Sequence, residues 1–139
     1  MIKRILLTIA LTLIFTTPVH AEPLSTEDAT LIVRTVWLEA GNQPIEGKRL
    51  VAAVILNRVD SEQFPDTVEG VLSAPGQFAT FHALSKSHPT IEDAIAVQME
   101  ISKRSNTEVM FFRTKRYGTG EPLMKVGDHY FSGLRRGCV

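Results

Sequence analysis

The sequence has a single cysteine, Cys138, so it cannot form an internal disulfide bond. It also lacks a charge excess, because 15 basic residues balance 15 acidic ones. This balance argues against the basic surface of a nucleic-acid-binding protein. No internal repeat, low-complexity linker or long run of one charge is present. These absences favour one globular domain that is stabilised by its hydrophobic core alone and has no nucleic-acid partner.

The N-terminal apolar run, residues 5–15, is shorter than the roughly 20 residues needed to span a bilayer. Lys3 and Arg4 precede it, and small residues flank His20 near its end, as in a secretory signal peptide. We expect residues 1–21 to be a signal peptide and 22–139 a single catalytic domain with no stable membrane span. The expected location is the periplasm or cell envelope, or outside the cell, and the domain is expected to be a monomer. N-terminal sequencing of the exported protein should begin at Glu22.

The hydrophobic periodicity of the remaining chain predicts a mainly helical domain. Apolar residues at helical spacing predict a helix that starts after Thr26 as its N-cap and stops at Gly41. A second helix over 45–59 is apolar on all sides at its centre and should lie in the middle of the domain. A short helix to about residue 72 and a long one over about 90–104 follow. Two strands, 109–112 and 126–131, are expected to pair, which gives an α+β fold with a small β hairpin in the C-terminal half.

Glu39 is the strongest candidate for chemistry. It lies near the end of the first expected helix, where its position in projection is close to that of Ile32 on the edge of the apolar stripe. A carboxyl group at such a place can be partly desolvated, and desolvation favours its protonated form. A protonated glutamate near neutral pH can act as a general acid. The alternative is a solvated glutamate with no special role.

Several short motifs, in order, resemble the SleB-type cell-wall hydrolase family of spore cortex-lytic enzymes and their relatives. The similarity runs from about Ala29 to Phe131. The matching segments are Glu39-Ala40, Glu46-Gly47, the apolar run 51–56, Asn57-Arg58-Val59, Phe64-Pro65-Asp66-Thr67-Val68, Pro75-Gly76-Gln77-Phe78, Met110-Phe111-Phe112 and Gly127-Asp128-His129-Tyr130-Phe131.

This resemblance implies a lysozyme-like fold and cleavage of the glycan strand of peptidoglycan by lytic transglycosylation, with Glu39 as the acid. It implies no cofactor. One position departs from the family pattern: many members have a second glutamate four residues after the catalytic one, and this chain has Gln43. Glutamine can donate and accept hydrogen bonds but supplies no charge. The spore enzymes also carry a separate wall-binding domain, for which we expect no room in this chain.

The reaction implied by the resemblance needs one acid, whereas ordinary glycosidases use two carboxylates. Glu46 is the nearest second candidate, although its position in the first turn of a helix also suits the helix dipole. Residue types that suit sugar rings make five further residues candidates for lining the cleft. They are Gln77, Phe78, Tyr117, His129 and Tyr130. Phe78 and Tyr130 could instead pack in the core.

Three other functions remain open on sequence grounds. A hydrolytic muramidase or glucosaminidase would need a base that activates water. A metal-dependent peptidase or amidase would use the histidines, but their spacing matches no ordinary zinc pattern, so no metal site is predicted. A non-catalytic peptidoglycan-binding module would leave glycan strands intact.

Overall fold

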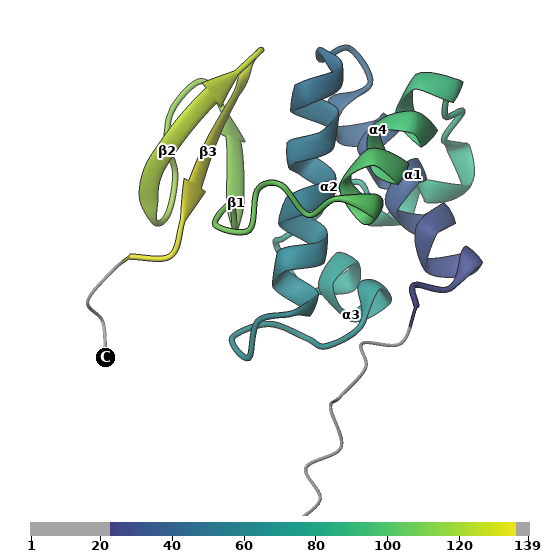
Figure 1. The fold of residues 1–139 in the computed structure, drawn as a ribbon, viewed down its shortest axis with the longest axis horizontal. Coiled ribbons are helices and arrows are strands. Elements are labelled where there is room, and N and C mark those ends of the chain that lie inside the picture. Colours follow the sequence, from purple (N-terminus) through teal and green to yellow (C-terminus); the bar gives the residue numbers. More distant parts are fainter. Residues whose placement is uncertain (1–22, 136–139) are drawn as a thin grey trace, which may run out of the picture.

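The computed structural model describes residues 23–135, and both the expected signal peptide and Cys138 lie outside them (Figure 1). In chain order the elements are α1 (Thr26–Ala40), α2 (Ile45–Val59), α3 (Val68–Ser73), the 3₁₀ helix η1 (Phe81–Lys86), α4 (Ile91–Ser102), β1 (Phe111–Thr114), β2 (Glu121–Val126) and β3 (His129–Gly133). Within the described part of the chain, no helix is both long and apolar enough to cross a membrane.

Helix α2 is the centre of the molecule. Every residue from Leu50 to Arg58 is buried, as expected for a helix that is apolar on all sides. Figure 1 shows α2 between the sheet on one side and helices α1 and α4 on the other. Because α2 contacts elements all around it, its last residues can reach both the sheet and the loops beside α1.

The ends of the helices are largely where the sequence predicts them. The N-cap of α1 is a correction: Ser25, not Thr26, is in extended conformation, and its hydroxyl accepts a hydrogen bond from the Asp28 amide at 3.0 Å. Thr26 is already the first helical residue. At α4 the residues form a capping box, with Thr90 and Asp93 each accepting a hydrogen bond from the other's backbone amide.

A buried ion pair joins α2 to α4. The Lys48 ammonium lies 2.9 Å from an Asp93 carboxylate oxygen, and the two side chains are 4% and 0% exposed. Burial alone would raise the pKa of Asp93, but hydrogen bonds from Lys48 and Thr90 outweigh it and hold that pKa below its usual value. Lys48 also contacts Glu92 at the surface. The pair therefore couples the start of α4 to the central helix.

The two expected strands do pair, antiparallel, with Phe112 opposite Phe131. The sequence prediction missed β2, which makes a three-stranded sheet of order β1-β3-β2. The segment 126–131 was expected to be one strand, but it contains the turn between β2 and β3 at Gly127-Asp128, where Gly127 has φ 57°. The α+β class is confirmed, and the two expected strands are two of the three strands of a slightly larger sheet.

Candidate active site

Glu39 lies in the last turn of α1 and is half-buried. The hydroxyl of Thr80, just before η1, donates a hydrogen bond of 2.5 Å to its carboxylate. Burial raises the pKa of Glu39 above its ordinary value, and the Thr80 hydrogen bond offsets part of this rise because it stabilises the ionised form. The cause of the shift is burial, as the sequence suggested, and not a neighbouring carboxylate. Such a group holds its proton to higher pH than a solvated glutamate does.

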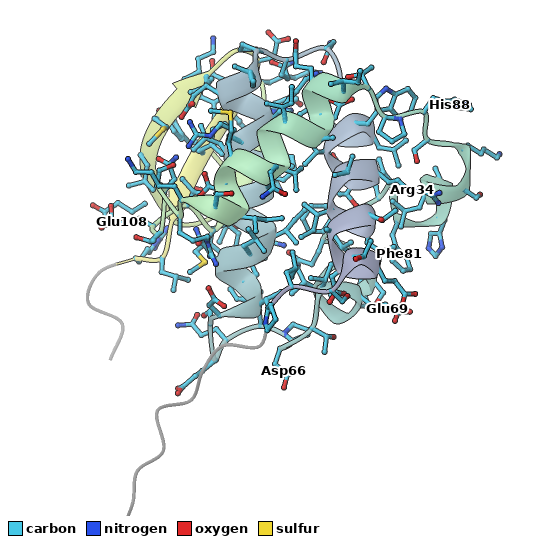
Figure 2. All side chains as sticks on the ribbon, turned by 45° about the vertical axis from the view of Figure 1, so that its right-hand side comes forward. Arg34, Asp66, Glu69, Phe81, His88 and Glu108 are labelled. Carbon is cyan, nitrogen blue, oxygen red and sulfur yellow. The ribbon has the colours of Figure 1, made fainter. Side chains whose placement is uncertain are left out.

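Thr80 is held in place by the segment that it begins. Its carbonyl oxygen accepts a hydrogen bond from the Ala83 amide at 2.8 Å in the first turn of η1. This segment, over which the sequence predicted no helix or strand, is a short 3₁₀ helix packed against α1. Figure 2 places Arg34 on α1 and Phe81 in η1 on the same side of the molecule, away from Glu108 beside the sheet. Glu39 therefore comes from α1, and its partner Thr80 is the residue that precedes the 3₁₀ helix packed against α1.

Gln43, at the family position where many members have glutamate, connects α1 to the sheet. Its side chain is 7% exposed. Its carbonyl oxygen accepts a hydrogen bond from the Asp128 amide at 2.8 Å, and its amide nitrogen donates to the Asp128 carboxylate at 3.1 Å. Gly127 approaches closely, since an added Cβ would lie 2.2 Å from the Gln43 oxygen. A glutamine suits this site because it must donate and accept at once.

The pair Asn57-Arg58 does more than end α2. The Asn57 amide donates to the carbonyl oxygens of Asn106 and Val109, at 2.7 and 2.8 Å. The Arg58 guanidinium donates to the carbonyl of Met110 at 2.8 Å and to the Gln77 side chain at 2.9 Å. The end of the central helix thus fixes both the approach to β1 and the loop that leads to Thr80. Sequence reasoning missed this function, because it depends on contacts between distant segments.

Two of the five predicted cleft residues lie in the interior. Phe78 is 5% exposed and packs against Phe112, with ring centroids 6.0 Å apart. His129 is 3% exposed and lies 5.2 Å from the same ring. Burial lowers the pKa of His129, and its Nδ1 has no hydrogen-bond partner within residues 23–135. These two side chains therefore pack in the interior against Phe112 of β1 and support the sheet, and the prediction that they line the cleft is wrong.

The other three predicted cleft residues are accessible. Tyr117 is 37% exposed and makes an edge-to-face contact with Tyr130, at 5.0 Å between centroids. The Lys125 ammonium lies 5.0 Å from the Tyr130 ring centroid. Gln77 is exposed and lines a pocket of about 280 Å³ next to the sheet. The two tyrosines form an aromatic surface on β3 and the loop between β1 and β2.

Glu46 lies in the first turn of α2. Its carboxylate forms an ion pair with Arg49 at 3.2 Å and is 48% exposed. It lines a groove of about 750 Å³ formed with α4. Across residues 23–135, no group of three or more potential ligands from His, Cys, Asp and Glu is arranged to hold a metal ion. The described structure therefore brings Glu39 together with Thr80 and the 77–80 loop, and turns Glu46 toward α4.

Comparison with known proteins agrees with this architecture. The solved catalytic domain of the Bacillus cereus SleB protein superposes with a TM-score of 0.71 at 28% identity, covering 80% of this chain and 93% of that one. The catalytic domain of the germination-specific lytic transglycosylase SleB from Bacillus anthracis gives 0.67 at 29% identity, with coverages of 78% and 95%. The small sheet beside a helical body is thus a known arrangement.

Sequence comparison gives the same relatives. The spore cortex-lytic enzyme of Bacillus cereus is 46% identical over 77% of this chain and 44% of its own length, and that of Bacillus subtilis is 31% identical over 77% and 38%. The chain thus spans less than half the length of these curated relatives. The family model described as Cell Wall Hydrolase matches residues 42–132, a match that begins just after Glu39. Matched over most of its length, the chain belongs to the cell wall hydrolase family.

Proposed function

We propose that this domain cleaves the glycan strand of peptidoglycan as a lytic transglycosylase, with Glu39 as its single acid and base. The observation that carries the proposal is the environment of Glu39: it is half-buried, has a raised pKa, and accepts a hydrogen bond from a neutral hydroxyl. A general acid needs a proton at the working pH and access to the leaving group; the raised pKa favours the first, and the partial exposure of Glu39 favours the second.

The proposed reaction uses Glu39 twice. The protonated carboxyl group donates its proton to the glycosidic oxygen that leaves N-acetylmuramic acid. The N-acetyl oxygen of the substrate assists at the anomeric carbon, which removes the need for a protein nucleophile. The ionised Glu39 then accepts the proton of the C6 hydroxyl as that oxygen closes on the anomeric carbon. The product is a 1,6-anhydro ring, and the tethered hydroxyl replaces water as the nucleophile.

The position of Glu46 favours this route over hydrolysis. An inverting hydrolase needs a second carboxylate across the sugar ring, and a retaining one needs it about 5 Å from the acid. Glu46 pairs with Arg49 and faces α4. Gln43 is already hydrogen-bonded to Asp128. Neither position supplies a base beside Glu39. In this proposal Tyr117, Tyr130 and Gln77 contact the sugars.

The test is Glu39→Gln, which keeps the shape of the side chain but cannot donate a proton. Release of soluble muropeptides should fall by at least about a hundredfold, as is typical when a general acid is removed. Glu46→Gln is the matched control, since it makes the same chemical change on the α4 side and should keep activity. A folded Glu39→Gln protein with wild-type turnover would end the assignment.

Product analysis separates the proposed reaction from hydrolysis. Mass spectrometry should find chain ends that are one water lighter than reducing ends, with no label from heavy-oxygen water. Label in most of the new chain ends would instead identify a muramidase or a glucosaminidase. The absence of any cleavage of purified glycan strands by the wild-type protein would favour a binding module.

A further inference from the structure

A second feature beside the proposed site is a small pocket that contains two arginines and no acid. Its volume is about 280 Å³, and Arg58 and Arg113 both line it. The remaining lining residues are Gly76, Gln77, Phe111, Phe112, Gly118, Thr119 and Ser132, none of which carries a negative charge. Two positive charges that share a confined space without a counter-ion repel each other, so the pocket favours an anion.

Arg58 is a buried cation that forms no ion pair with any residue from 23 to 135. Its side chain is 4% exposed, and its guanidinium lies 5.1 to 5.4 Å from the centroids of three rings, those of Phe64, Phe78 and Phe111. Burial lowers its pKa to about 10. Buried charges are normally paired. Within residues 23–135, however, no carboxylate lies within ion-pair distance of this guanidinium, and its hydrogen bonds to Met110 and Gln77 use Nε and Nη1.

Arg113 reaches the same pocket from β1. Its side chain lies across Gly118: a Cβ added at that glycine would be 2.6 Å from the Arg113 Cδ and 2.9 Å from its Nε. The absence of a side chain at position 118 therefore makes room for this arginine. Arg113 has no ion pair among the residues that the structure describes. Both guanidiniums thus retain donor groups that a ligand can use.

We infer that this pocket, the Arg58–Arg113 pocket, binds a carboxylate group of the substrate. The inference rests on the proposed function, because it takes peptidoglycan as the substrate. Gln77 lines the pocket and lies three residues before Thr80, the partner of Glu39, so their Cα atoms are at most about 11 Å apart. Arginine is suited to this task because its planar group binds carboxylates with two parallel hydrogen bonds.

Peptidoglycan offers carboxylates from two sources. A muramic acid without its peptide has a free lactyl carboxylate, whereas strands with peptide stems have carboxylates on the peptide. Both present the same planar anion to the pocket. The position of the pocket beside the loop that carries Thr80 means that such a contact would fix the register of the strand relative to Glu39.

The test compares Arg113→Gln with Arg116→Gln. Both residues are exposed and lie in or just after β1, but only Arg113 lines the pocket. On glycan strands with free carboxylates, Arg113→Gln should raise KM about tenfold with little change in kcat, because one charge-assisted contact is lost. Arg116→Gln should leave KM unchanged, and Arg113→Lys should recover part of the loss.

Chemically amidated strands provide the second arm, since amidation removes the negative charge. On these strands Arg113→Gln should behave as wild type. An effect on peptide-free strands identifies the lactyl carboxylate, and an effect confined to peptide-bearing strands identifies the stem. Equal KM values for Arg113→Gln and Arg116→Gln, or the same rise on amidated strands, would overturn the inference. That result leaves the role of Glu39 standing, whereas an active Glu39→Gln protein removes the proposed function itself.

Discussion

Replacing Lys48 by methionine should destabilise the fold strongly without touching the proposed site. Methionine keeps much of the length of the side chain but removes the charge that faces Asp93. Because Asp93 is 0% exposed and lies 2.9 Å from Lys48, the substitution leaves a buried carboxylate without its cation. Removing one partner of a buried pair typically costs about 3–5 kcal/mol. The usual stability of a domain is about 5–15 kcal/mol, so this is a large share of it.

Urea denaturation at pH 7, followed by circular dichroism, measures the cost directly. For a domain of this size, each kcal/mol lowers Tm by about 4 °C, so a fall of about 12 °C or more is expected. Lys86→Met, on an exposed part of η1, is the control and should change stability by no more than about 0.5 kcal/mol. At temperatures where the variant is folded, its specific activity should equal that of wild type.

The pH dependence gives an independent check. In wild type the pKa of Asp93 is lowered from 3.8, so its contribution is present above that pH and is lost as the pH falls through the folded-state pKa. In the variant, burial without Lys48 raises the pKa of Asp93, and protonation then relieves the unpaired charge. The difference in free energy of unfolding should therefore be smaller at pH 4 than at pH 7. A variant within 1 kcal/mol of wild type at pH 7 would refute this reasoning.

Two further substitutions test the site. Gln43→Glu should destabilise the fold by about 1–3 kcal/mol at pH 7, since it places a carboxylate against that of Asp128, and lowering the pH should relieve this cost. Adding Asp128→Asn should restore part of the stability. An unchanged urea midpoint for the single variant would contradict a stabilising role for the Gln43–Asp128 hydrogen bonds. Thr80→Val should raise the pKa of Glu39, because the lost hydrogen bond stabilises the ionised form. The high-pH limb of kcat/KM should then move to higher pH while Thr80→Ser stays near wild type, and a limb that does not move would mean that Thr80 does not tune the acid.

The helical half of the fold could be predicted because its signals are local. The all-apolar centre of α2 and the capping box of α4 are readable within a few residues of sequence. Strand β2 was missed because Pro122 and the polar residues around it suggest a loop, and because its strand character depends on pairing with β3. The turn at Gly127 was overlooked because the segment 126–131 was interpreted as one continuous strand.

The candidate site was predictable only in part, because most of its contacts join residues that are far apart in the sequence. The position of Glu39 on the edge of an apolar stripe follows from helix geometry alone. Its partner Thr80 is 41 residues away, and Gln43 contacts Asp128 across 85 residues, so neither pairing has a local signature. The arginines of the pocket likewise come from α2 and β1. Side-chain type indicated sugar contacts at His129 and Phe78, but packing against Phe112 places both in the interior.

The contact between Gln43 and Asp128 also sets the order in which the molecule can become complete. It closes a loop of 85 residues and ends at a turn that precedes the last strand. Because closing such a loop costs conformational entropy, we expect the contact to form only after most of the chain has folded. A chain that emerges from its N-terminus presents Glu39 early, but the sheet side of the site is secured late. The Asp128 amide, bonded to the Gln43 side chain, is consequently a natural reporter in pulsed hydrogen exchange. Its protection should mark the moment at which the sheet side of the proposed site is secured.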